Sequence, residues 1–312
     1  YVPIGKWLLN VTKSNHTQAQ SFNTNAIDEE LKWANESGFN SVRISLSYAV
    51  WANDPQGFKE RLKKFLKIAD SHHLSVVPVL FDDVNVGGAP ELGKQDDPVP
   101  GVHNSQWNPN PGRKIIEDKS KWGSLENYVR DITGTLHRDK RILFWDLYNA
   151  QGSGGMGEKS LPLMESSFRW AREEGTRQPI TAAVWGDAND PMSARLMEQS
   201  DLITFQSFES PLIVQARLRA CENYKRPIIC SGWLKRQSGS TFADILPVLS
   251  EKGVGWYSRG LVKGRAQLYI PDDQKAGGGS EPKVWQQDVL WEDGKPYDRK
   301  EIELIKAFNF IK

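Results

Sequence analysis

Short apolar runs alternate along this chain with segments whose apolar residues recur at helical spacing, and this alternation limits the fold more than any other feature. The strand-like runs span 7–12, 41–47, 74–81, 141–148, 179–185, 202–208, 227–233 and 254–259. Helical spacing follows them at 26–37, 57–71, 123–137, 160–175, 191–199, 211–222, 240–252 and 299–310. Near-continuous runs of β-branched residues and leucine are typical of parallel strands that are buried on both faces.

Strands that are each followed by a helix, in regular order, predict an α/β fold closed into a (β/α)8 TIM barrel. A doubly wound sheet is the alternative, but it would need a break in that order. The 312 residues suit a single barrel domain with insertions, spanning 1–312. The loops after strands three, four and eight (82–122, 150–159 and 260–285) are long and rich in glycine and proline. They leave the carboxyl ends of strands, where barrels place their sites.

Two strand ends resemble the catalytic strands of cellulase-like and xylanase-like bacterial glycoside hydrolases of the retaining (β/α)8-barrel clan. Asp-Leu-Tyr-Asn at 146–149 is similar to the strand that ends in Asn followed by the general-acid Glu. Ile-Ile-Cys-Ser-Gly-Trp at 228–233 is similar to the strand whose tip carries the nucleophilic Glu. Ser-Val-Arg at 41–43 resembles the arginine motif of the second strand. The resemblance covers almost the whole chain and implies a saccharide or small-molecule site in the barrel mouth.

The two catalytic positions depart from that family pattern. Ala150 stands at the acid/base position and Gly232 at the nucleophile position. A retaining glycosidase needs two carboxyl groups about 5–5.5 Å apart, one as nucleophile and one as acid and then base. Because neither alanine nor glycine carries an ionisable group, we predict that classical glycosidase activity is absent.

The expected pocket lining departs from the family as well. Strand six reads Gln-Ser-Phe at 206–208 where the family has His-Asn-Tyr, and strand eight ends in Ser-Arg at 258–259 where the family has Asn-Trp. By strand alternation and position, we expect the ligand site to be lined by Arg43, Ser45, Ser47, Tyr148, Asn149, Trp185, Gln206, Phe208, Trp233, Tyr257 and Arg259. For any single tryptophan, packing of a helix against the barrel is an equally good interpretation.

Charged residues near the strand ends offer candidates for a new chemistry. Without Glu partners, Arg43 is expected to be an unpaired cation, and Asp146 to belong to a polar network beneath the site. Burial would raise the pKa of a carboxyl group toward the range of a general base, and the candidates are Asp82, Asp83, Asp187 and Glu209. For each of these, a solvated carboxylate or a helix cap is the stronger interpretation.

Three lysines invite a Schiff-base interpretation, namely Lys13, Lys235 and Lys263. None of them falls on an inward strand position. Surface lysines are therefore the stronger interpretation.

Three functions stay open at this point. The leading hypothesis is a re-tooled or engineered pocket, used for proton abstraction, for aldol-type cleavage or for binding a planar ligand between aromatic walls. The second is a natural pseudo-glycosidase that binds carbohydrate without cleaving it. The third is a glycosidase inactivated by substitution, as is done to trap substrate complexes.

Composition narrows the range of partners. The net charge is +1 with no basic stripe, which gives no case for nucleic acid, and the apolar runs are too short for a membrane helix. Five histidines and two cysteines, Cys221 and Cys230, show no metal-binding spacing, so we expect neither a metal nor a cofactor. We expect a soluble monomer whose parent family is bacterial and secreted or periplasmic, while the compartment of this chain stays open.

Overall fold

A computed structural model describes residues 22–84, 92, 97–105, 107–187, 190–274 and 281–309. The first predicted strand, at 7–12, lies outside the described residues, as does Lys13. The other predicted strands are present as β1 (Ser41–Ser45), β2 (Ser75–Asp82), β3 (Trp145–Asn149), β4 (Ile180–Thr181), β5 (Ile203–Gln206), β6 (Ile228–Trp233) and β7 (Gly255–Ser258).

Each predicted helix is present, with its ends within about two residues of the expected positions. These helices are α2 (Thr24–Glu36), α4 (Pro55–Ser71), α6 (Trp122–Leu136), α7 (Leu161–Glu173), α8 (Pro191–Gln199), α9 (Pro211–Glu222), α10 (Phe242–Glu251) and α11 (Arg299–Asn309). The sequence did not predict α3 (Tyr48–Asn53), α5 (Arg113–Ile116) or the 3₁₀ turns η1 (Lys119–Lys121), η2 (Gly157–Ser160) and η3 (Arg236–Ser238). The α3 and α5 segments are too short to show a helical period in the sequence.

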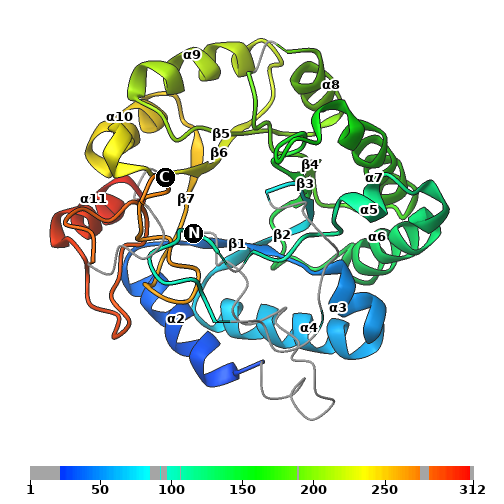
Figure 1. Cartoon of the computed structure of the whole chain (residues 1–312), viewed down its shortest axis with the longest axis horizontal. Helices are drawn as coiled ribbons and strands as arrows, with labels where there is room; N and C mark the ends of the chain where they lie inside the picture. Colours follow the sequence, from blue (N-terminus) through cyan, green and yellow to red (C-terminus); the bar gives the residue numbers. More distant parts are fainter. Residues whose placement is uncertain are drawn as a thin grey trace.

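All the strand pairs are parallel, and the helices surround the strands as an outer ring (Figure 1). The ladder runs β1-β2-β3-β4 and, separately, β5-β6-β7. A parallel bridge between Val184 and Phe205 joins the two sheets. No ladder joins β7 to β1 within the described part of the chain, but the hydroxyls of Ser41 and Tyr257 hydrogen-bond across that gap at 2.7 Å. The architecture is the α/β barrel that the sequence predicted.

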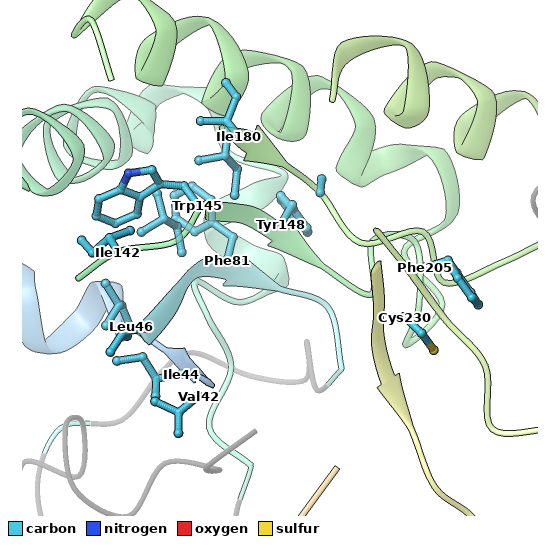
Figure 2. Packing of buried hydrophobic residues seen from close by; sticks show 14 of the residues in the cluster. Val42, Ile44, Leu46, Phe81, Ile142, Trp145, Tyr148, Ile180, Phe205 and Cys230 are labelled. Carbon is cyan, nitrogen blue, oxygen red and sulfur yellow. The ribbon is translucent and has the colours of Figure 1, made fainter. Parts of the chain in front are cut away.

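The core has two parts, one on each side of the strands. Outside the barrel lie Val42, Ile44 and Leu46, at alternate positions along β1 and just past its end (Figure 2). They belong to the large cluster that includes the apolar faces of the helices. Inside it, Val77, Phe144, Leu202 and Tyr257 form a small separate cluster. The odd-numbered positions of β1 therefore face the barrel interior, which puts Arg43 there.

The second strand of the prediction, at 41–47, ends two residues earlier in the structure. Ser47 is the N-cap of α3, and its hydroxyl accepts a hydrogen bond from the Val50 amide at 3.4 Å. A capping serine competes with strand geometry, because its side chain satisfies a backbone donor of the helix that follows. Ser47 is therefore a helix cap rather than part of the pocket-lining strand.

Candidate active site

A buried polar network crosses the barrel at the end of β3. Arg43 donates to one carboxylate oxygen of Asp146 through Nε at 3.0 Å and Nη2 at 2.5 Å. Its Nη2 also donates to Asn149 Oδ1 at 2.7 Å, and Gln206 Nε2 donates to the same oxygen at 2.6 Å. Asp146 thus belongs to the interior network, as predicted. The expectation that Arg43 is an unpaired cation is wrong, because Asp146 neutralises it.

The two positions that the strand motifs matched to the family's catalytic residues lie at either end of this network. Ala150 directly follows Asn149, is fully buried and has a φ of +49°. A Cβ built on Gly232 would lie 3.1 Å from Gln206 Cδ and 3.2 Å from its Cγ. Gln206 therefore occupies the space into which a side chain at 232 would extend, and it reaches from there to the residue before Ala150. Neither position presents a carboxyl group.

Three predicted lining residues are buried in packing instead. Tyr148 is fully buried against Phe81, with ring centroids 5.9 Å apart. Trp233 is also fully buried, 4.9 Å from the ring of Phe242. Tyr257 belongs to the inner cluster and hydrogen-bonds Ser41. These side chains build the barrel and do not line an open mouth.

The alternation rule fails at Tyr148 for a local reason, whereas Trp233 was expected at the mouth by its position and not by alternation. Asp146 and Asn149, three residues apart, both contact Arg43, so regular alternation breaks within β3. In β6, the register against β7 shifts between Cys230 and Trp233, which adds one residue to β6. That bulge turns Trp233 outward, toward α10 and Trp256.

An aromatic pair remains at the rim of the barrel. Trp185 is 37% exposed, and its ring lies 5.9 Å from that of Phe208, which is half-buried. Ser45, at the end of β1, is also half-buried. These three residues are accessible, as a ligand-contacting role requires.

Two of the candidate bases are surface groups. Asp187 is exposed. The Glu209 side chain is 47% exposed, accepts a hydrogen bond from Ser207 at 2.7 Å and pairs with Arg217 at 3.1 Å. Since both carboxylates are exposed to solvent, the interpretation of a solvated surface group holds for both.

The adjacent carboxyls of Asp82 and Asp83 are both buried. Asp83 accepts from Tyr148 Oη at 2.9 Å, from the Gly152 amide at 2.7 Å and from the Ser160 hydroxyl. Burial raises the pKa of Asp83 to about 6 against these donors, which favour its charged form. Asp83 is therefore a structural anchor for the loop after β3, with its acceptor sites occupied.

Asp82 faces the other way, toward the mouth. Its Oδ1 accepts from Trp107 Nε1 at 2.9 Å and from the Val84 amide at 3.1 Å. Burial raises the pKa of Asp82 to about 7, while Trp107 and Val84 oppose the rise and the nearby Arg259 also lowers it. This carboxyl changes its charge close to neutral pH.

Of the lysine candidates, the two that the structure describes do not provide an amine nucleophile. Lys235 pairs with Asp272 at 2.8 Å. Burial lowers the pKa of Lys263, but Glu281 and Glu292 outweigh burial and hold it above the ordinary value. A Schiff-base lysine needs the opposite shift.

Trp107 and His103 are two residues of the mouth that sequence reasoning missed. Both lie in the long loop after β2, beside Arg259 of the β7 end. The length of the 82–122 loop was the available signal, but nothing in the sequence shows where an irregular segment folds back. Among the described residues, no group of three or more His, Cys, Asp or Glu side chains gathers as a metal site would, and no helix has the length and apolar character to cross a bilayer.

No protein-family model and no curated protein matches this sequence. Solved structures do match this chain in fold. The endo-β-1,4-mannanase from Thermotoga petrophila has 12% sequence identity, covers 92% of this chain and 73% of its own, and gives a TM-score of 0.61. GH5_18 from Streptomyces cattleya in complex with GlcNAc has 13% identity over 97% of this chain and 80% of its own, with a TM-score of 0.62.

The exo-β-1,4-mannosidase Op5Man5 from Opitutaceae bacterium strain TAV5 covers 99% of this chain and 59% of its own at 15% identity, with a TM-score of 0.65. At such low identity the likeness concerns the fold. This chain has the barrel fold of cellulase-like glycoside hydrolases, as the motifs of β3 and β6 predicted.

Proposed function

We propose that this chain binds a saccharide in the barrel mouth and does not hydrolyse it. The observation that carries the proposal is the contact of Gln206 with Gly232, since an amide side chain fills the space of the family's nucleophile. With Ala150 at the acid/base position, both partners of the double displacement are missing.

The remaining groups suit a polyhydroxylated ligand. Asn149 and Gln206 offer amide donors and acceptors within one rigid network, held by the Arg43–Asp146 ion pair. Trp185 and Phe208 offer apolar faces at the rim, on which a sugar ring can stack. The GH5_18 structures in complex with GlcNAc and with Manβ1-4GlcNAc support a saccharide as the ligand class.

Calorimetric titration with Manβ1-4GlcNAc and mannobiose, beside an aryl-mannoside hydrolysis assay, tests this function. We expect saturable binding and no release of the aryl group. Trp185→Ala should weaken binding roughly tenfold. Leu143→Ala serves as the control, because Leu143 is 49% exposed and precedes β3 at the opposite end of the barrel. Release of sugar by the unchanged protein would overturn the proposal.

The same contact argues against a glycosidase inactivated by simple substitution. Such a protein should regain activity when Ala150→Glu and Gly232→Glu are combined. A side chain at 232 meets Gln206, so we expect this double variant to stay inactive. Recovered hydrolysis in the double variant would favour the inactivated glycosidase.

Proton abstraction in a re-tooled pocket is a second candidate function. The observation that favours it is the buried carboxyl group of Asp82. Its pKa of about 7 suits a general base at neutral pH. An activated benzisoxazole is the probe, and its ring-opening rate should rise with pH through about 7 in the unchanged protein. Asp82→Asn should abolish that rise, and a rate that this substitution leaves unchanged would exclude Asp82 as the base.

A further inference from the structure

The loops that follow β2 and β7 are tied together over one side of the barrel mouth. Gln267 donates to the carbonyls of Val99 and Val102 at 2.8 and 3.0 Å and accepts from the Gly101 amide at 3.2 Å. His103 Nδ1 lies 2.7 Å from the Ile270 carbonyl oxygen. These bonds hold the segment from Val99 to His103 against the loop that follows β7.

Arg259 lies between these loops without an ion-pair partner among the described residues. It is the next inward position after Tyr257, and its guanidinium carbon lies 5.6 Å from the centre of the Trp107 ring. The side chain is half-buried, and its Nε is buried without a hydrogen-bond partner. No carboxylate among the described residues lies within ion-pair distance of it, whereas the neighbouring Arg43 is neutralised by Asp146.

Charged groups of both signs surround Arg259. Burial lowers the pKa of Arg259 to about 10, and the nearby cation Arg43 also lowers it. The carboxylates that raise this pKa are Asp82, Asp272 and Asp288. Asp272 is itself paired with Lys235. Burial lowers the pKa of His103 to about 4, so His103 is neutral. Asp82 alone changes its charge near pH 7.

An arginine that lies over the ring of a tryptophan and has an unsatisfied buried donor suits the planar and bidentate geometry of a carboxylate. We propose that Arg259 and Trp107 form a subsite for the carboxylate of an acidic saccharide, such as one that carries a uronic acid. This inference rests on the proposed saccharide binding and names the chemical class of its ligand. Asp82 supports the subsite by remaining neutral when the ligand binds.

Asp82 gives the subsite a pH dependence. Below about pH 7, Asp82 is protonated, and Arg259 is free to pair with the ligand carboxylate, which stays charged well below that pH. Above it, the Asp82 anion compensates Arg259 and repels the ligand. Affinity for the acid should therefore fall severalfold between pH 6 and pH 8.5.

The test compares three sugars and benzoate by calorimetry. The sugars are a β-1,4-linked glucuronic acid–glucose disaccharide, its methyl ester and cellobiose. The ester keeps the shape of the acid and removes its charge. We expect the acid to bind about tenfold or more tightly than the ester at pH 6. Arg259→Gln should remove this preference, Arg259→Lys should keep part of it, and Asp82→Asn should remove the pH dependence while keeping the preference. Benzoate is the probe for a carboxylate without a sugar. It should bind as tightly as the acid only if the subsite recognises the carboxylate alone.

The outcomes separate the two proposals. Equal affinity for the acid and the ester, unaffected by Arg259→Gln, would overturn the carboxylate subsite and leave saccharide binding standing. Binding of none of the three sugars would overturn both. Unchanged affinity of Arg259→Gln for the methyl ester shows that the variant is folded. Tight binding of benzoate, with none of the sugars bound, would overturn saccharide binding and mean that the ligand is a simple carboxylate.

Discussion

At the residue scale, the contact between Gly232 and Gln206 decides what position 232 can hold. A Cβ there approaches Gln206 Cδ to 3.1 Å, so Gln206 would have to shift away from Asn149. We expect Gly232→Ala to lower the free energy of unfolding by about 1–3 kcal/mol, the usual range for overpacking. Urea denaturation measures this cost.

Gly123 is the matched control for that substitution. It lies in α6, and a Cβ there meets no atom within 4 Å. Gly123→Ala should leave stability unchanged or raise it by up to about 1 kcal/mol, the helix propensity difference. Combining Gly232→Ala with Gln206→Ala should cost less than the sum of the two single variants. Strict additivity would show that the two positions do not compete for space.

The buried carboxyls of Asp82 and Asp83 determine how stability depends on pH. Their pKa values in the folded state, about 7 and about 6, lie above those of an unfolded aspartate. Between about pH 4 and 7 the folded state therefore holds more protons than the unfolded state, so these groups make stability fall as pH rises. Asp82→Asn keeps the Oδ1 acceptor and should flatten this fall. Thermal melts from pH 4.5 to 8 check it, and a slope identical to that of the unchanged protein would contradict the assignment.

Sequence alone located the residues of the site better than it oriented them. The positions of Ala150, Gly232, Asn149 and Gln206 followed from the strand motifs, and the structure brings them together. The directions of other side chains depend on the β6 bulge, and no residue type in the sequence indicates that bulge. The partner of Arg43 was missed for a related reason, since Asp146 reaches it only through the barrel interior.

At the scale of elements, helix starts show how local signals work. Asp190 and Ser210 are the N-caps of α8 and α9, and a proline follows each. The Asp190 carboxylate accepts from the amides of Met192 and Ser193, at 2.9 and 3.0 Å, whereas Ser210 makes no side-chain cap bond. Asp190→Ala should cost about 1 kcal/mol and Ser210→Ala only a few tenths. Equal costs in chemical denaturation would show that the cap bond adds nothing.

Helix bounds were predictable because caps, prolines and apolar spacing all act within a few residues. Strand bounds were less predictable than helix bounds. The predicted strand at 179–185 contains only the two-residue β4, followed by the isolated bridge at Val184. Strand length depends on partners far along the chain, and local sequence does not encode them.

At the scale of the whole molecule, the described barrel consists of two hydrogen-bonded sheets that other contacts connect. Between β4 and β5 the connections include the Val184–Phe205 bridge and the bond of the Thr181 hydroxyl to the Leu202 carbonyl at 2.9 Å, and between β7 and β1 the bond of Tyr257 to Ser41. The large apolar cluster nevertheless extends from Ile27 in α2 to Ile305 in α11. Burial shared across both sheets predicts that they unfold together, as a single domain would.

Tyr257→Phe tests this prediction, because it removes the β7–β1 bond and keeps the ring that packs inside the barrel. The loss of a buried hydrogen bond should lower the free energy of unfolding by about 1–2 kcal/mol. Tyr48→Phe removes a more exposed bond to Ser124, 2.9 Å long, and should cost less. If the barrel is one cooperative unit, far-UV circular dichroism and tryptophan fluorescence will report one coincident transition that Tyr257→Phe shifts as a whole. Because Tyr257 belongs to the β5-β6-β7 sheet and Ser41 to the other, a shift confined to one of two separate transitions would mean that the sheets unfold independently.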